Sequence, residues 1–182
     1  MRLTNILPLL FFTLIIFSCS EDAQEADFNA IADSFKSTNQ DSVVFYAQKS
    51  LSLNLGDKHD YYSYFLIAES YQRQKNYSLA LTNYLESQRL IPKESIFDYY
   101  RYATNNNLGK IFKMYSNYEL AIKHYRKALD YVEDKNKASL LYNLGNAYTS
   151  SGQYEKATKA YLDSKEIAVQ QNDELRQARL HH

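Results

Sequence analysis

Residue types that usually mark turns, metal sites or large aromatic cores are scarce in this 182-residue sequence. It has four glycines, two prolines, one cysteine and no tryptophan. Few glycines and prolines leave little material for β-turns and hairpins, so an all-helical protein is favoured. Without tryptophan, the 18 tyrosines and nine phenylalanines must supply nearly all the aromatic packing area.

The sequence also lacks an excess of charge of either sign. Lysine plus arginine and aspartate plus glutamate each number 21, which gives a formal net charge of zero. No basic field is therefore available to attract nucleic acid or an anionic membrane surface, and we expect no nucleic-acid partner. The length suits one domain that buries its core without disulfides or metals.

No catalytic or cofactor-binding arrangement is found along the chain. The sequence has no glycine-rich phosphate loop after a strand, no paired cysteine or histidine spacing for zinc, and no histidine near a plausible nucleophile. We expect all four histidines to lie on the surface: His59, His124, His181 and His182. The sequence therefore predicts a protein that is not an enzyme and has no metal site, cofactor or small-molecule substrate.

One apolar run stands at the N-terminus. Met1-Arg2 is followed by Ile6 to Phe17, a run that is apolar except for Thr13 and is interrupted by Pro8. Twelve helical residues span roughly 18 Å, which is short of the roughly 30 Å hydrocarbon core of a bilayer. A secretory signal is therefore favoured over a transmembrane helix.

The only cysteine follows this run, in Ile16-Phe17-Ser18-Cys19, which resembles the lipobox of bacterial lipoproteins. The resemblance implies that residues 1–18 are a signal peptide, that Cys19 is lipidated, and that residues 19–26 form a tether. Two or three acyl chains would anchor the protein stably to a membrane. The resemblance implies a membrane of the bacterial cell envelope, the outer membrane above all, with the protein periplasmic or exposed on the cell surface. An ordinary secreted protein with a free thiol is the alternative.

Three later stretches align with one another residue by residue: LIAESYQRQKNYSLALTNY from Leu66, NLGKIFKMYSNYELAIKHY from Asn107 and NLGNAYTSSGQYEKATKAY from Asn143. Each has a small residue, then an aromatic residue three positions later, then an alanine followed after four positions by tyrosine. The small residues are Ala68, Gly109 and Gly145, and the alanine–tyrosine pairs are Ala80 and Tyr84, Ala121 and Tyr125, and Ala157 and Tyr161. Small residues are expected where paired helices cross closely.

This pattern resembles the tetratricopeptide repeat, a helix-turn-helix unit of 34 residues. The resemblance implies an all-α fold, with antiparallel helix pairs stacked into a right-handed superhelix over residues 27–182. We expect clear units at 61–94, 102–137 and 138–172, a degenerate unit at 27–60 and a capping helix at 173–182. Truncation of a longer array is the alternative explanation of the last segment.

The unit spacing is irregular, because Ala80 and Ala121 are 41 residues apart whereas Ala121 and Ala157 are 36 apart. A spacing of 41 exceeds the repeat by about two helical turns. Inserted after Pro92, such an excess would lengthen the next helix, from about Ser95, without rotating its buried face much.

The resemblance also implies a concave groove lined by the first helix of each unit. The residues at the groove positions are Tyr62, Phe65, Glu69, Gln72 and Arg73 in the first clear unit, Asn106, Lys110, Lys113 and Met114 in the second, and Ser139, Tyr142, Asn146, Thr149 and Ser150 in the third. Their polar members can hydrogen-bond an extended peptide, and their aromatic members can anchor it. Ordinary solvated helix surface is the alternative.

Phe65 and Glu69 stand where one family groove uses lysine and asparagine to clamp a C-terminal carboxylate, so we expect that mode to be absent. The expected function is a lipid-anchored, non-catalytic envelope adaptor that binds a protein or peptide partner. Two alternatives remain: a sensory accessory subunit of an envelope signalling system, and a glycan-binding lipoprotein that uses Tyr99, Tyr100 and Tyr102.

Overall fold

The computed structural model describes the backbone of residues 27–180 and the side chains of residues 27–172. Within this range the regular structure is entirely helical, as predicted. The α-helices are α1 (Phe28–Ser34), α2 (Gln40–Leu51), α3 (Asp57–Arg73), α4 (Tyr77–Leu90), α5 (Asp98–Met114), α6 (Tyr118–Leu129), α7 (Asp134–Ser150) and α8 (Tyr154–Leu180), with a 3-10 turn η1 (Ser95–Phe97) before α5. The predicted signal peptide and Cys19 lie outside the described residues.

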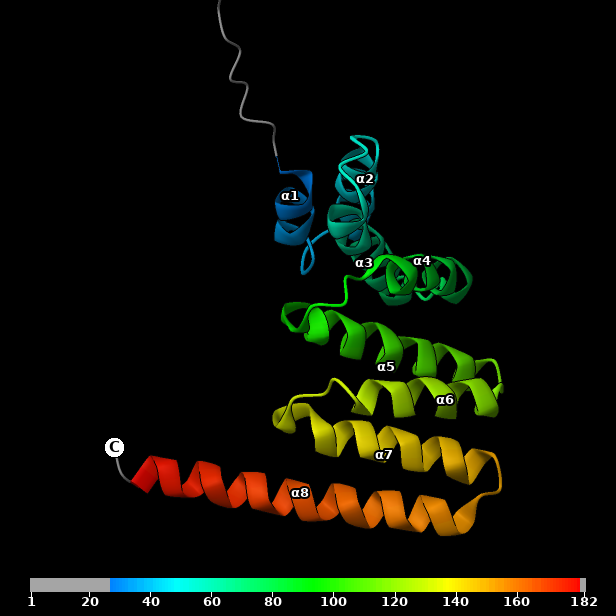
Figure 1. Ribbon diagram of the computed structural model, residues 1–182, viewed down its shortest axis with the longest axis vertical. Coiled ribbons are helices and arrows are strands. Elements are labelled where there is room, and N and C mark those ends of the chain that lie inside the picture. Colours follow the sequence, from blue (N-terminus) through cyan, green and yellow to red (C-terminus); the bar gives the residue numbers. More distant parts are fainter. Residues whose placement is uncertain (1–26, 181–182) are drawn as a thin grey trace, which may run out of the picture.

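Consecutive helices pack as antiparallel pairs, α1 with α2 through α7 with α8, and successive pairs are rotated relative to one another along the stack (Figure 1). The first helices α3, α5 and α7 each have 17 residues. None of the helices between residues 27 and 180 combines the length and apolarity needed to cross a bilayer.

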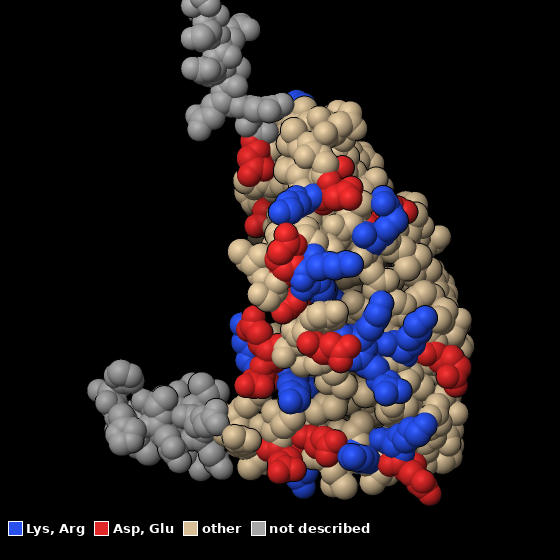
Figure 2. Space-filling model, viewed as in Figure 1, with Lys and Arg blue, Asp and Glu red and all other residues tan. Residues whose placement is uncertain are grey.

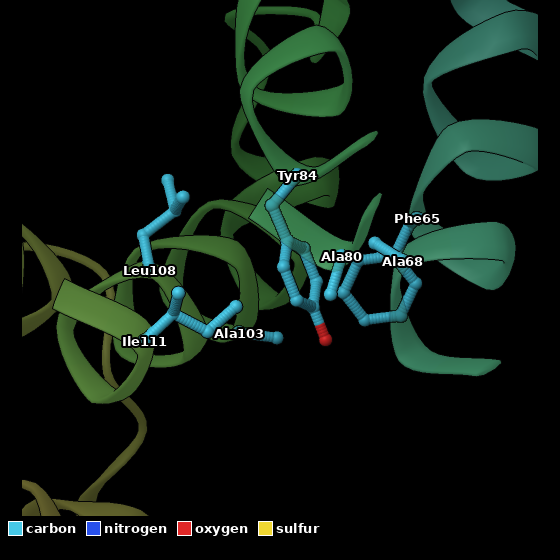
Figure 3. Close-up of a cluster of buried hydrophobic side chains, with 7 residues drawn as sticks. All are labelled: Phe65, Ala68, Ala80, Tyr84, Ala103, Leu108 and Ile111. Atoms are coloured by element: carbon cyan, nitrogen blue, oxygen red, sulfur yellow. The ribbon is translucent and has the colours of Figure 1, made fainter. Parts of the chain in front are cut away.

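Tyrosine rings fill the space between the two helices of a pair. Phe65, Ala68, Ala80 and Tyr84 form one buried cluster with Ala103, Leu108 and Ile111 of α5 (Figure 3). A second cluster joins Ala121, Tyr125 and Ala128 of α6 to Leu140, Leu144 and Ala147 of α7. The alanines of the repeat are therefore core residues, and each cluster continues from one pair into the next.

The small residues of the first helices make room for these tyrosines. A Cβ atom at Gly109 would lie 2.7 Å from the ring of Tyr125, and one at Gly145 would lie 2.6 Å from the ring of Tyr161. The sequence predicts only that small residues stand where paired helices cross. The structure shows that each of these two glycines lies against a tyrosine ring of the paired helix.

The extra residues between the first two clear units do not lengthen a first helix, so that prediction is wrong. Helix α5 is no longer than α3 or α7. The wider spacing comes instead from two other places. The connection from α4 to α5 has seven residues (91–97), whereas that from α6 to α7 has four (130–133). Helix α4 is also two residues longer than α6. Pro92 explains why the longer connection begins at residue 91. A proline disfavours the helical conformation at the residue before it, and Ile91 has a ψ angle of 122°.

The predicted separate capping helix at 173–182 is also wrong. Helix α8 continues without a break from Tyr154 to Leu180, over 27 residues. The sequence between these positions has no glycine or proline and is rich in lysine, glutamate, alanine, leucine and glutamine, which all favour helix, so nothing interrupts it. The side chain of Gln171 bonds to the carbonyl oxygen of Asp134, at the start of α7.

Candidate partner-binding face

The groove positions of α3 differ widely in exposure. Glu69, Gln72 and Tyr62 are half-buried and Arg73 is exposed. Phe65 is 1 % exposed, so its prediction as a groove residue is wrong. The ring of Tyr100, from the start of α5, lies 5.4 Å from that of Phe65 and covers it.

Six polar side chains from three neighbouring segments make up what we call the central cluster: Asp33, Lys36, Tyr62, Glu69, Asn107 and Lys110. Ion pairs and a hydrogen bond join the first four, and the charge of Glu69 acts on Lys110 of α5 without direct contact. The Lys36 ammonium pairs with Glu69 at 3.1 Å and with Asp33 at 3.3 Å. The hydroxyl of Tyr62 donates to Asp33 at 2.8 Å. The end of α1 and the turn after it are thereby joined to α3.

Burial and charge act in opposite directions on the two lysines of the central cluster. Burial works to lower the pKa of Lys36, but the charges and hydrogen bonds of Glu69 and Asp33 outweigh it, and its pKa is raised. For Lys110 burial prevails over the attraction of Glu69, and its pKa is lowered. Across residues 27–172, no carboxylate lies within 4 Å of the Lys110 ammonium.

Helix α5 closes the central cluster on its other side. Lys110 donates a long hydrogen bond of 3.4 Å to Asn107, whose amide donates to the hydroxyl of Tyr84 at 2.9 Å. Burial raises the pKa of Tyr84 well above its ordinary value, so this hydroxyl stays neutral. Lys110 is therefore half-buried, and the one described group that holds its ammonium is a neutral amide.

Two amide side chains at the groove positions lack hydrogen-bond partners. The Oε1 atom of Gln72 and the Oδ1 atom of Asn106 are both buried and accept no hydrogen bond from the described residues. Asn106 is only 8 % exposed, which is more buried than a groove residue should be. Buried polar groups without partners are rare in folded proteins, and each such group destabilises the free state by about 1 to 3 kcal/mol.

The groove positions of α7 carry hydroxyl and amide groups that already have partners. The hydroxyl of Tyr161 donates to Asn146 at 2.9 Å and lies 3.1 Å from that of Thr149. Thr149 and Ser150 also bond to carbonyl oxygens of their own helix. Tyr142 is 55 % exposed, and its ring lies 5.5 Å from that of Tyr161.

Three further groove positions stand apart from the central cluster. Ser139 and Met114 are exposed and Lys113 is half-buried, and no hydrogen bond or ion pair joins them to the central cluster.

Asp33, Lys36 and Asn107 were missed by the sequence reasoning. Asp33 and Lys36 precede the aligned stretches, in a unit too degenerate to assign positions, and Asn107 stands beside a groove position rather than on it. The available signal was the opposite charge of Asp33 and Lys36, which stand three residues apart in the sequence.

Two histidines predicted to lie on the surface are in fact packed, so that prediction is wrong for both. His124 is 7 % exposed, its ring stacks on Phe112, and its Nδ1 lies 3.0 Å from Oδ1 of Asn105. Burial, followed by the charges of Lys127 and Lys123, lowers the pKa of His124 to about 4. His59 is half-buried against Asn29 and Ser50. Both contacts are between helices and lie outside the central cluster.

The tyrosines considered for glycan binding are divided between surface and core. Tyr100 packs against Tyr61, Tyr62 and Phe65, and Tyr99 is 49 % exposed. They do not form one open aromatic platform. Acidic and basic side chains are interspersed over the face seen in Figure 2, and residues 27–172 hold no group of three metal-ligating side chains.

The family described as tetratricopeptide repeat matches residues 60–134 and 100–170. The human intraflagellar transport protein 88 homolog is 33 % identical over 100 residues, which are 53 % of this chain and 12 % of that protein. The chain therefore spans only a small part of this relative.

Solved structures share the fold at low sequence identity. A crystal structure of MamA aligns with a TM-score of 0.65 and 12 % identity, over 80 % of this chain and 79 % of that one. A crystal structure of BtubC from P. vanneervenii aligns with a TM-score of 0.68 and 16 % identity, over 80 % of this chain and 63 % of that one.

Proposed function

Because the chain belongs to the tetratricopeptide repeat family, which consists of protein-interaction scaffolds, we propose that it is a non-catalytic adaptor whose central cluster holds an extended peptide segment of a partner protein. The helix pairs supply a rigid support, and the side chains of α3 and α5 supply the contacts. No chemical step is required of it.

The observation that carries this proposal is the unpaired polar groups beside the central cluster. The acceptor oxygens of Gln72 and Asn106 are buried without a donor, so these side chains would gain a hydrogen bond by turning toward a bound peptide, and an extended peptide offers backbone N–H groups at regular intervals. The Lys110 ammonium needs an acceptor, which a backbone carbonyl or an acidic side chain provides. Binding would therefore satisfy groups that are unsatisfied in the free protein.

Photo-crosslinking in the source cells tests the proposal. A photoreactive residue is placed at Lys110 and, as a control, at Arg126, which is exposed on α6. We expect one protein to crosslink from position 110 and not from 126, and its crosslinked peptide to be located by mass spectrometry. Equal crosslinking from both positions would place the interface elsewhere.

The identified peptide then allows a sharper test with purified protein. We expect Gln72→Ala and Asn106→Ala each to weaken binding about tenfold, the usual loss for one buried hydrogen bond. The same variants should unfold at an equal or higher urea concentration than the wild type, because each removes an unpaired buried polar group. Weaker binding that merely follows lost stability would argue against direct contacts.

The adaptor is further proposed to be held on a membrane of the bacterial cell envelope by lipid on Cys19. The support is the sequence Ile16-Phe17-Ser18-Cys19 at the end of the apolar run. We expect Cys19→Ala to move the protein from the membrane fraction to the soluble fraction after cell lysis, while Cys19→Ala in a version lacking residues 1–18 changes nothing. Retention of the full-length variant in the membrane fraction would show that the anchor is not a lipid on this cysteine.

A further inference from the structure

The tyrosine that stands four residues after the repeat alanine occurs in three helix pairs. A further helix of the described chain covers this tyrosine in only two of them. Tyr84 and Tyr125 are both 0 % exposed. Tyr84 is buried with Ala103, Leu108 and Ile111 of α5, and Tyr125 with Leu140 and Leu144 of α7. In each case the first helix of the following pair covers the tyrosine.

The third tyrosine, Tyr161 of α8, remains partly exposed. Among the helices described, none packs on the outer side of the α7–α8 pair. Tyr161 lines a cavity of about 430 Å³ together with Tyr142, Ser164, Lys165 and Ala168. Tyr142 occupies the position that Phe65 has in α3, yet Tyr142 is 55 % exposed whereas Phe65 is 1 % exposed. We call the surface formed by these five residues the end face.

The end face differs in one chemical respect from the surface of α6 that α7 covers. Ile122 and Leu129 of α6 belong to the apolar cluster shared with α7. Their equivalents in α8, counted from the repeat alanines Ala121 and Ala157, are the exposed residues Thr158 and Lys165. A helix as apolar as α7 would therefore bury the Lys165 ammonium without a counter-charge, which is strongly unfavourable.

Lys165 makes no ion pair with the described residues. An occupant of the end face must then combine two properties. It needs an apolar residue to cover the rings of Tyr142 and Tyr161, as α5 covers Tyr84, and it needs a carboxylate to pair with Lys165. The existing interfaces between pairs indicate that this occupant is a helix.

From the open cavity at Tyr142 and Tyr161 and the unpaired Lys165 on its rim, we propose that the end face binds an acidic amphipathic helix of a partner protein. This helix extends the stack by continuing the interface that α5 and α7 make within the chain. The end face does not include the central cluster, so this inference stands apart from the proposed peptide-binding function.

Stapled helical peptides test the end face directly. The starting peptide has the sequence of residues 134–150, because α7 is the helix that covers Tyr125. The start of α7 lies next to the end of α6, where Leu129 stands, so a glutamate is placed in turn at each of positions 136–140. Matched peptides carry glutamine or lysine at the same position, and binding to the folded protein is measured by fluorescence anisotropy.

We expect at least one glutamate peptide to bind about tenfold more tightly than its glutamine counterpart, as one desolvated charge pair allows. Lys165→Glu should reverse the order and favour the lysine peptide, while Lys159→Glu, an exposed α8 residue outside the cavity, should not. Tyr142→Ala should weaken binding of every peptide. Absence of binding by all the peptides, or a glutamate preference that survives Lys165→Glu, would overturn the proposal.

Sedimentation velocity of the protein alone provides the second readout. We expect a monomer whose sedimentation coefficient does not change in the Lys165→Glu variant. Self-association that is lost with Lys165→Glu or Tyr142→Ala would identify a second copy of this chain as the occupant and would also overturn the proposal. Circular dichroism verifies that each variant remains helical.

Discussion

Gly109 and Gly145 show how a single hydrogen atom in place of a side chain sets the distance between two helices. Each lies against the ring of the tyrosine that follows the repeat alanine, Tyr125 or Tyr161. In the α3–α4 pair the corresponding residue is Ala68, so this pair accommodates a methyl group that the α5–α6 and α7–α8 pairs do not. The tyrosine and the small residue facing it therefore act as one packing unit.

Gly145→Ala should destabilise the fold by about 1 to 3 kcal/mol, because the new methyl group would overlap the Tyr161 ring. Urea unfolding followed by circular dichroism measures the change. In the Tyr161→Ala background the same substitution should have little effect or even stabilise the helix, since the obstructing ring is gone. Equal losses in both backgrounds would mean that the ring is not the cause.

His124 makes stability depend on acidity. Its pKa falls from an ordinary value of 6.5 to about 4 in the folded protein. Above pH 6.5 the residue is neutral in both states and has no effect. Between pH 6.5 and 4 only the unfolded chain takes up the proton, so the free energy of unfolding decreases by up to about 1.4 kcal/mol per pH unit, and the decrease stops below pH 4.

We expect urea midpoints to fall more steeply between pH 6.5 and 4.5 in the wild type than in His124→Gln, whose amide keeps a polar contact for Asn105. His182→Gln serves as a control for a histidine outside the described residues. Parallel pH profiles for the wild type and His124→Gln would show that His124 is protonated as easily in the folded state as in the unfolded state.

At the scale of elements, the turns inside the last three pairs share one backbone conformation but not one residue type. Lys75, Ser116 and Gly152 all have positive φ angles, of 62°, 58° and 77°. In the first two cases an asparagine, Asn76 or Asn117, then caps the following helix, because its Oδ1 atom accepts a hydrogen bond from the backbone N–H group three residues later. Only the last turn uses glycine, the residue that adopts this conformation without strain.

Gly152→Ala should destabilise the protein by about 1 kcal/mol through its backbone alone, because a Cβ there would meet nothing within 4 Å. Ser116→Gly is the matched opposite change and should be neutral or slightly stabilising. Thermal unfolding of both variants measures the pair. A neutral Gly152→Ala would indicate that the turn relaxes to another conformation.

At the scale of the whole molecule, stability is expected to be graded along the stack. Each pair contacts only its neighbours, and the first pair begins with α1, which has seven residues. We expect amide hydrogen exchange to be fastest in α1 and slowest in α4 to α6, which have neighbours on both sides. Uniform protection from α1 to α7 would mean that the stack opens as one unit.

The repeat register was predictable from sequence because it depends on local spacing. The alanine and the tyrosine four residues later occupy equivalent places in all three clear pairs, and the first helices have equal length. Contacts between pairs were not predictable in the same way. The burial of Phe65 depends on Tyr100, 35 positions away, and that of His124 depends on Asn105 and Phe112 in another helix.

In the candidate site too, the residues set by the repeat spacing were predictable and those set by contacts between pairs were not. Lys110, Glu69 and Tyr62 were identified by their positions in the repeat, and they do lie in the central cluster. Asp33 and Lys36 join it from a unit whose sequence departs too far from the pattern to be aligned. Phe65 was predicted to line the groove but is buried, because Tyr100 of the next pair covers it.

A core built on tyrosine has an optical consequence. The chain has 18 tyrosines and no tryptophan, so it does not absorb at the long-wavelength edge where only indole is excited. A partner peptide or helix that contains one tryptophan could therefore be excited selectively in a mixture with this protein. Its emission would report burial of the indole when the ligand binds, whether on the central cluster or on the end face. Neither molecule would need an attached label.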